Sequence, residues 1–272
     1  MVRLFGPLVG LFFAVALLWS FGVGAIQAIR EPEPATAVQK FHLAPHEPEP
    51  GFSFNGAFGK FDRAQLQRGF QVYKEVCSNC HSLHFVAFRD LAALGYSEAE
   101  VKAIAKDWSN KAKVVDPKTG DESQRDNVPA DHFPKVYYAG TGNPPDLSLV
   151  TKARHEGPEY VYSLLTGYQD QPAELLKEFP DSKTPDGLYY NPYFANLNIA
   201  MPAPLADDQV TYGDGTKATK QQMAADVAAF LTWTAEPKME KRKQTGWAVL
   251  GFLLAATVLA YLAKRNIWAK VH

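Results

Sequence analysis

The chain has 272 residues, 28 of them Lys or Arg and 29 Asp or Glu, and only two cysteines. This length allows one sizeable domain or two small ones. Residues 31–237 carry 19 basic against 28 acidic side chains, a net charge of −9, which argues against nucleic acid as a partner and favours cationic partners. Acidity that serves only solubility remains the alternative.

Both ends of the chain carry long uncharged stretches, residues 4–29 and 244–263. Each is long enough to cross a bilayer as a helix. We interpret residues 1–29 as either a secretory signal peptide or an N-terminal transmembrane anchor, because their apolar core is longer than a signal peptide needs. Residues 244–263 are predicted to form a transmembrane helix, followed by a tail at 264–272. Basic residues flank this helix on both sides, so their count does not decide its orientation.

A Pro- and Glu-rich linker is predicted at residues 30–54, ahead of a domain at 55–237. Helical spacing of apolar residues and capping patterns predict four helices in this domain. They begin after Asp62, after Ser97 with Glu100, near Pro158, and after Thr219 with Gln222.

Two segments of the domain are predicted to be loops. Residues 110–131 contain turn residues and charge with little periodicity, which is typical of a surface excursion. Residues 179–215 are dense in Pro, Gly, Asn and aromatic side chains, which indicates long ordered loops. No internal repeat, dinucleotide or phosphate-binding motif, or alternating strand pattern is found, so the domain is predicted to be mainly α.

The only cysteines, Cys77 and Cys80, form a C-x-x-C-H motif with His81. A structural zinc site needs four ligands, normally from two separated pairs, and the chain has no second cysteine pair. His84 could serve as the fourth ligand, but four ligands within eight residues close poorly around one tetrahedral ion. A redox dithiol is expected at the start of a helix in a βαβ unit, whereas this motif follows a predicted helix. Covalent haem fits best, because the two thiols would bond the haem vinyl groups and His81 would be the proximal iron ligand.

The sixth iron ligand is predicted to be Met201. Pro202 holds the preceding residue extended, so a rigid loop can present the thioether. Met1 is the initiator, Met239 lies in the charged membrane edge, and Met223 occupies the apolar face of a predicted helix. The remaining histidines are weaker candidates because of their positions in the linker, beyond the anchor, or in surface or core segments: His42, His46, His132, His155 and His272.

Several stretches of the chain resemble the cytochrome c1 family, in the form found in alphaproteobacteria and mitochondria. They include RGFQVYKEVCSNCHSL, PPDLS, YVYSLLTGY, NIAMPAPL and AAFLTWTAEP. The resemblance covers most of residues 55–270. A shorter run, VYYAGTGN, stands before PPDLS where many members have a longer one, so the loop over that haem edge departs from the family.

The resemblance implies a class I cytochrome c-like haem domain with long loop insertions and one covalently bound haem c. Its first and last helices would cross near the haem, bringing Gly69 and Phe70 against Phe230 and Trp233. It also implies that Arg154 pairs with a haem propionate, as a guanidinium suits a carboxylate. Pro144 and Pro145 would line the His81 side, where a backbone carbonyl could orient the imidazole.

The function implied by the resemblance is electron transfer within a dimeric quinol-oxidising cytochrome bc1 complex. The chain would accept electrons from a Rieske iron–sulfur protein, assemble with cytochrome b, and reduce a c-type cytochrome. Haem attachment would place the domain in the periplasm of a bacterial inner membrane and residues 264–272 in the cytoplasm. No acid, base or nucleophile is expected on this chain.

Two alternatives remain open. One is a membrane-anchored cytochrome shuttle or oxidase subunit, and the other is a membrane-tethered thiol oxidoreductase that uses Cys77 and Cys80.

Overall fold

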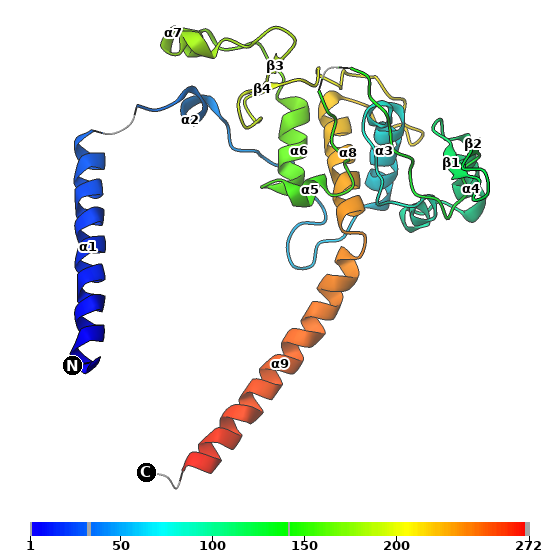
Figure 1. Cartoon of the computed structure of the whole chain (residues 1–272). Coiled ribbons are helices and arrows are strands. Elements are labelled where there is room, and N and C mark those ends of the chain that lie inside the picture. The colour runs from blue at the N-terminus through cyan, green and yellow to red at the C-terminus, as the bar shows by residue number, and fades with distance from the viewer. Residues whose placement is uncertain (1, 32–33, 141, 270–272) are drawn as a thin grey trace. The chain divides into compact units, whose positions relative to one another are not determined.

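The computed structural model describes residues 2–31, 34–140 and 142–269 (Figure 1). Residues 1, 32, 33, 141 and 270–272 lie outside the described residues. Among these are Met1, interpreted above as the initiator, and His272, placed above beyond the anchor. The chain forms two units, Met1–Phe41 and His42–His272, which are treated separately below.

The first unit consists of helix α1 (Val2–Arg30) and the short helix α2 (Ala37–Phe41). Within α1, Leu4–Arg30 is long and apolar enough to cross a membrane, as is α9 (Met239–Trp268) of the second unit. These two helices contain the uncharged stretches identified in the sequence. By length and composition alone, α1 fits either a membrane anchor or a signal sequence.

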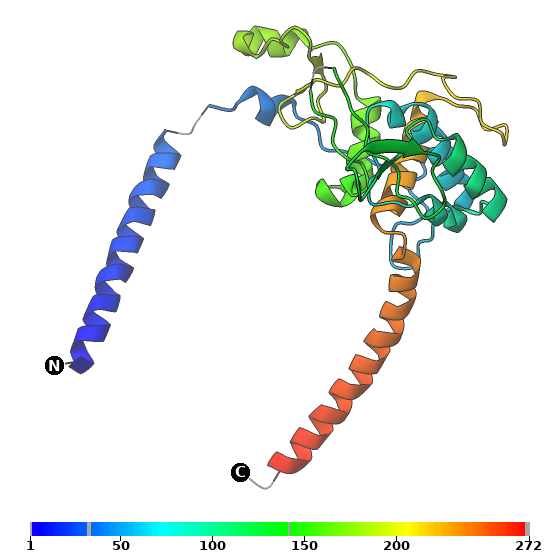
Figure 2. The ribbon, with the colours of Figure 1, turned by 45° about the vertical axis from the view of Figure 1, so that its right-hand side comes forward.

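The second unit is mainly helical, as predicted, and α9 extends from its C-terminal end (Figure 2). Its remaining elements are, in chain order, α3 (Arg63–Glu75), η1 (Cys77–Asn79), η2 (Phe88–Leu94), α4 (Glu98–Asp107), β1 (Ala112–Val115), β2 (Glu122–Arg125), α5 (Val150–Ala153), α6 (Gly157–Thr166), α7 (Ala173–Glu178), η3 (Pro180–Ser182), β3 (Tyr189–Tyr190), β4 (Asn198–Ile199) and α8 (Lys220–Ala235).

The four predicted helices correspond to α3, α4, α6 and α8, and their caps explain where they begin. The Asp62 carboxylate accepts from the backbone N–H groups at the start of α3. Ser97 and Glu100 form the predicted capping box of α4. At α8 the Thr219 hydroxyl accepts from the backbone of Gln222, whose side chain instead donates to Asp226 at 2.9 Å.

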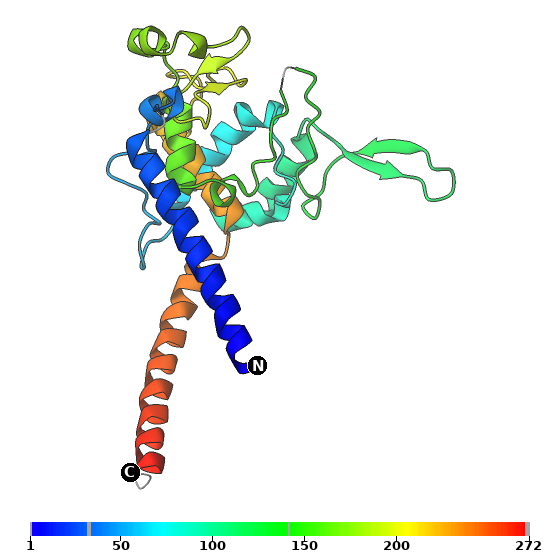
Figure 3. The same cartoon turned by 60° about the vertical axis from the view of Figure 1, so that its left-hand side comes forward.

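No strand was predicted from the sequence, but the structure contains two short strand pairs. β1 pairs with β2 in an antiparallel hairpin within residues 110–131, and β3 pairs with β4 within the predicted loops. The hairpin extends away from the helices of the unit (Figure 3). Its side chains are almost all exposed. Since neither of its faces is buried, the sequence had no need of the apolar–polar alternation by which strands are recognised.

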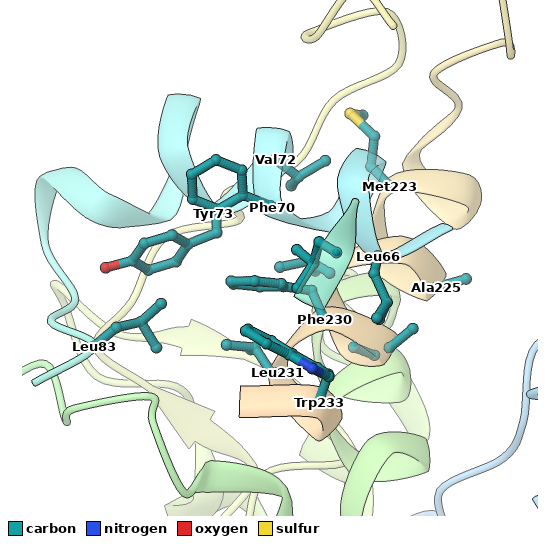
Figure 4. Packing of buried hydrophobic residues seen from close by; sticks show 14 of the residues in the cluster. Leu66, Phe70, Val72, Tyr73, Leu83, Met223, Ala225, Phe230, Leu231 and Trp233 are labelled. Carbon is teal, nitrogen blue, oxygen red and sulfur yellow. The ribbon is translucent and has the colours of Figure 1, made fainter. Parts of the chain in front are cut away.

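The predicted crossing of the first and last helices is present, and Gly69 explains how close it is. A Cβ added to Gly69 would clash with the Asp226 carbonyl oxygen, so the backbone of α8 occupies the space of a side chain. Phe70 and Phe230 meet beside this point with ring centroids 5.6 Å apart. Phe230 also stacks on Trp233, and both are buried in the same core cluster as Phe70 (Figure 4).

Part of the segment predicted as a linker, residues 30–54, packs against the domain predicted at residues 55–237. Phe52 and Phe54 are buried in the same core cluster as the helices. The His46 backbone donates to the Ser163 hydroxyl at 2.9 Å. The folded unit therefore begins ahead of residue 55, because Phe52 and Phe54 contribute to its core.

A buried ion pair ties α3 to α8. Arg68 Nε lies 3.0 Å from an Asp226 carboxylate oxygen, and its Nη1 lies 2.8 Å from Asp214. The Asp226 side chain is fully buried. Burial raises the pKa of this carboxyl and Arg68 lowers it. The Arg68 guanidinium and the Gln222 amide therefore compensate Asp226 for its lost hydration.

We expect Arg68→Met to destabilise the domain by about 3 kcal/mol, because it leaves a buried carboxylate without its cation. For a domain of this size that corresponds to a melting temperature lower by roughly 6–12 °C. Circular dichroism during thermal unfolding measures it. Lys102→Met is the matched control, since Lys102 pairs with Glu98 on an exposed helix face and should cost less than about 1 kcal/mol. Equal effects of the two substitutions would contradict the prediction.

Candidate functional site

The C-x-x-C-H motif forms a tight turn at the end of α3. The helix ends at Glu75, and the 3-10 turn η1 begins at Cys77. The backbone N–H groups of Cys80 and His81 both donate to the Cys77 carbonyl, at 3.1 and 2.9 Å. Cys77 and Cys80 are not joined by a disulfide. The turn therefore presents both sulfurs and the imidazole from one short segment.

The environment of Cys77 does not suit thiol redox chemistry. Burial, and then the nearby Cys80, raises the pKa of the Cys77 thiol to about 12. Catalytic cysteines have a lowered pKa, because the thiolate is the nucleophile. The thiol oxidoreductase alternative therefore gains no support from this site.

The His81 ring is oriented by a backbone carbonyl. Its Nδ1 lies 2.8 Å from the Pro145 oxygen. Because a carbonyl only accepts, Nδ1 carries the hydrogen and Nε2 keeps its lone pair. Burial, the largest effect, lowers the pKa of His81. The ring is thus held in the neutral tautomer that can bind a metal through Nε2. The carbonyl that holds it belongs to Pro145, the residue that the resemblance implied.

Tyr73 also holds the turn in place, a role that its position in the sequence did not indicate. Its hydroxyl donates to the His81 carbonyl at 2.9 Å. The side chain is almost fully buried against Phe230, with ring centroids 5.8 Å apart. In the sequence Tyr73 stands four residues before Cys77, within the first predicted helix, and nothing local shows that it contacts His81.

His84 is not brought into the turn as a further ligand. Its backbone donates to Asp146 at 2.8 Å, and its ring lies edge-on to His132 with centroids 6.1 Å apart. Within the described ranges, no group of three or more His, Cys, Asp or Glu side chains is arranged to hold a metal ion. The zinc alternative therefore has no ligand set in this part of the chain.

Met201 lies on a loop whose backbone is fixed from two sides. It lies two residues after the end of β4, and its carbonyl accepts from the Tyr168 hydroxyl at 3.1 Å. A Cβ added to Gly142 would meet the Ala200 Cβ at 3.4 Å. The loop that carries Pro145 and the loop that carries Met201 therefore approach each other near the start of the first. Tyr168 is a second supporting residue that sequence reasoning missed.

The other described methionines occupy the core. Met223 is fully buried on α8, as predicted, and Met239 is buried at the start of α9. Met201 is half-buried. Among the described residues it is therefore the methionine whose thioether is not already enclosed by the core.

Arg154 ends the short helix α5 and is exposed. Burial raises the pKa of Tyr160, while the Arg154 guanidinium beside it lowers that pKa. The Arg154 Nη1 lies 3.5 Å from the Ala153 carbonyl oxygen. None of the ion pairs among the described residues includes Arg154, so its charge is available to an acidic group of a ligand. His155 next to it is also exposed.

These residues fit a haem c group by the chemistry of their donors. Two adjacent thiols suit thioether bonds, and a neutral imidazole with a free Nε2 suits iron. The Arg154 guanidinium, which pairs with no carboxylate within the described part of the chain, suits a propionate.

Comparison with known proteins agrees with this donor set. A model described as the Cytochrome C1 family matches residues 52–271. The chain is 46% identical over 237 residues to cytochrome c1 of Rhodospirillum rubrum, covering 81% of this chain and 86% of that one. It is 41% identical over 232 residues to a mitochondrial protein of Arabidopsis thaliana named cytochrome c1 1, heme protein, covering 82% and 72%.

A third relative is longer than this chain. The protein named cytochrome b/c1 of Bradyrhizobium diazoefficiens is 45% identical over 244 residues, covering 81% of this chain but 35% of its own length. The chain thus corresponds to about a third of that protein.

Proposed function

Because the chain belongs to the cytochrome c1 family, we propose that it is the haem c electron-transfer subunit of a quinol-oxidising cytochrome bc1 complex. The observation that carries the proposal is the hydrogen bond from His81 Nδ1 to the Pro145 carbonyl within the C-x-x-C-H turn. It leaves the imidazole Nε2 free to bind the iron of a haem that Cys77 and Cys80 would hold.

Each site residue has one role in this proposal. Cys77 and Cys80 would hold the haem covalently, and His81 and Met201 would bind its iron. Arg154 pairs with a propionate, and Pro145 orients His81. Bound haem supplies a one-electron couple, whose potential His/Met ligation raises. The protein residues bind, orient and shield, and none of them transfers a group.

The partners follow from the same family membership. The chain receives electrons from a Rieske iron–sulfur protein, assembles with cytochrome b in a dimeric complex, and passes electrons to a c-type cytochrome. The haem domain faces the periplasm of a bacterial inner membrane. Helix α9 anchors it, and α1 is either a second anchor or a signal peptide. Two apolar helices at the ends of the chain support the membrane location.

A reduced-minus-oxidised spectrum of the purified chain tests the cofactor, and a pyridine haemochrome spectrum tests thioether attachment. We expect both to report one haem c. A chain that shows no haem absorbance would instead favour the thiol oxidoreductase alternative.

Copurification tests the complex. The tagged chain, extracted in mild detergent, should bring a cytochrome b and an iron–sulfur protein with it, and its haem should be reduced by added quinol. Haem that no quinol reduces would favour the anchored shuttle or oxidase alternative.

We expect electron transfer to a basic c-type cytochrome to slow steeply as salt rises, because residues 31–237 carry a net charge of −9. Screening limits the reach of this field to about 8 Å at physiological ionic strength. Stopped-flow oxidation over a range of salt concentrations measures the effect. An uncharged small oxidant is the control and should react at a constant rate. A constant rate with the basic cytochrome would leave the acidity as a solubility feature.

A further inference from the structure

The loop between Phe54 and Phe61 is fastened to the first turns of α9. Lys243 Nζ donates to the carbonyls of Phe54 at 2.6 Å and Gly56 at 2.7 Å. Lys243 is the last charged residue before the uncharged stretch 244–263. Its ammonium group is thus used to bind the loop backbone at the beginning of the span.

A second set of contacts fastens the far end of the same loop. A Glu240 carboxylate oxygen accepts from the Phe61 backbone N–H at 2.8 Å. The other oxygen lies 3.0 Å from Arg63 Nη2. Together with Lys243, Glu240 sets the position of the loop along the α9 axis.

The tip of the loop carries an aromatic ring against the span. Phe58 stacks face to face on Trp247, with ring centroids 5.0 Å apart and planes inclined by 6°. Phe58 is still 78% exposed and Trp247 48% exposed. The stacked pair therefore presents a continuous apolar surface to its surroundings.

The position of Trp247 fixes the depth of this pair. It lies one helical turn beyond Lys243, which places it about 6 Å along the helix from that charge. Tryptophan side chains near the ends of membrane spans are enriched at the boundary between headgroups and acyl chains. Because Phe58 stacks on Trp247, it lies at the same depth. Exposed basic residues at the same end of α9, Lys238, Lys241 and Arg242, suit anionic headgroups.

We propose that residues 55–60 form a membrane-contact loop, with Phe58 and Trp247 inserted together at the headgroup–acyl boundary of the lipid surface. The loop would hold the haem domain at a set height above the membrane, since it is tied to α9 at both ends. This inference rests on the proposed membrane span of α9.

Spin labelling of the full-length holoprotein in vesicles of phosphatidylcholine and phosphatidylglycerol tests the proposal. The label is attached to Phe58→Cys, and its collisions with oxygen and with a water-soluble nickel chelate are measured by power saturation. Phe85→Cys is the matched control, because Phe85 is a comparably exposed phenylalanine, at 65%, outside this loop. Leu253→Cys, within the uncharged stretch, reports the span itself. Wild type treated with the same label shows whether Cys77 and Cys80 react, and we expect no labelling.

We expect the ratio of oxygen to nickel effects to be several-fold higher at position 58 than at position 85, and lower than at position 253. A ratio at position 58 equal to that at 85 would overturn the membrane-contact loop while leaving the span intact. Low access of both reagents at 58 would mean that protein covers the loop, which also overturns the proposal. A water-like ratio at 253 would instead contradict the proposed span, and labelling of the wild type would contradict haem attachment.

Discussion

The double variant Cys77→Ala, Cys80→Ala is expected to hold no covalent haem. Both thioether bonds of the proposed attachment are made by these two sulfurs, and the chain has no other cysteine. Acid–acetone extraction followed by a pyridine haemochrome assay measures the haem that remains on the chain. The native chain should keep its haem through this treatment, and the variant should lose all of it.

Ser78→Ala is the matched control for this variant. Ser78 lies within the same turn, where its hydroxyl donates to the Lys74 carbonyl at 2.7 Å. Removing that bond should cost about 1 kcal/mol and leave attachment intact. Free haem released from the native chain by acid–acetone would contradict the thioether assignment.

Local chemistry accounts for what the sequence predicted well. Caps act over three or four residues, so Asp62 and Ser97 mark the starts of α3 and α4 without knowledge of the rest of the fold. Helical spacing of apolar residues likewise predicted the helices α3 and α8, in which Phe70 and Phe230 are buried. The close approach at Gly69 was implied by the family resemblance and is confirmed by the contact with Asp226.

Contacts between distant residues account for what was missed. The bond from Tyr168 to the Met201 carbonyl joins segments 33 residues apart, and nothing in the local pattern of either reveals it. The contribution of Phe52 and Phe54 to the core was hidden because Pro and Glu around them gave that segment the composition of a linker. The orientation of His81 by Pro145 came from the resemblance alone, since 64 residues separate the two.

Met201→Leu is expected to keep its haem and lose its function as a high-potential relay. Attachment through Cys77 and Cys80 does not involve the sixth ligand, so haem content should be unchanged. Loss of the neutral thioether leaves the iron to water, hydroxide or another side chain, each of which stabilises the ferric state better than sulfur does, so the potential falls. Each 59 mV is a tenfold change in a one-electron equilibrium. A fall of ~200 mV would make transfer from the Rieske centre strongly uphill.

Redox titration and quinol–cytochrome c turnover measure the two effects, and Met223→Leu is the matched control. Met223 is fully buried in the core, where a swap of similar volume should cost less than about 1.5 kcal/mol. It should leave both the potential and the turnover unchanged. If Met201→Leu instead keeps its potential and turnover, Met201 is a packing residue of its loop. A fall in potential with Met223→Leu would then make Met223 the ligand, which would require its side chain to leave the core around α8 when haem binds.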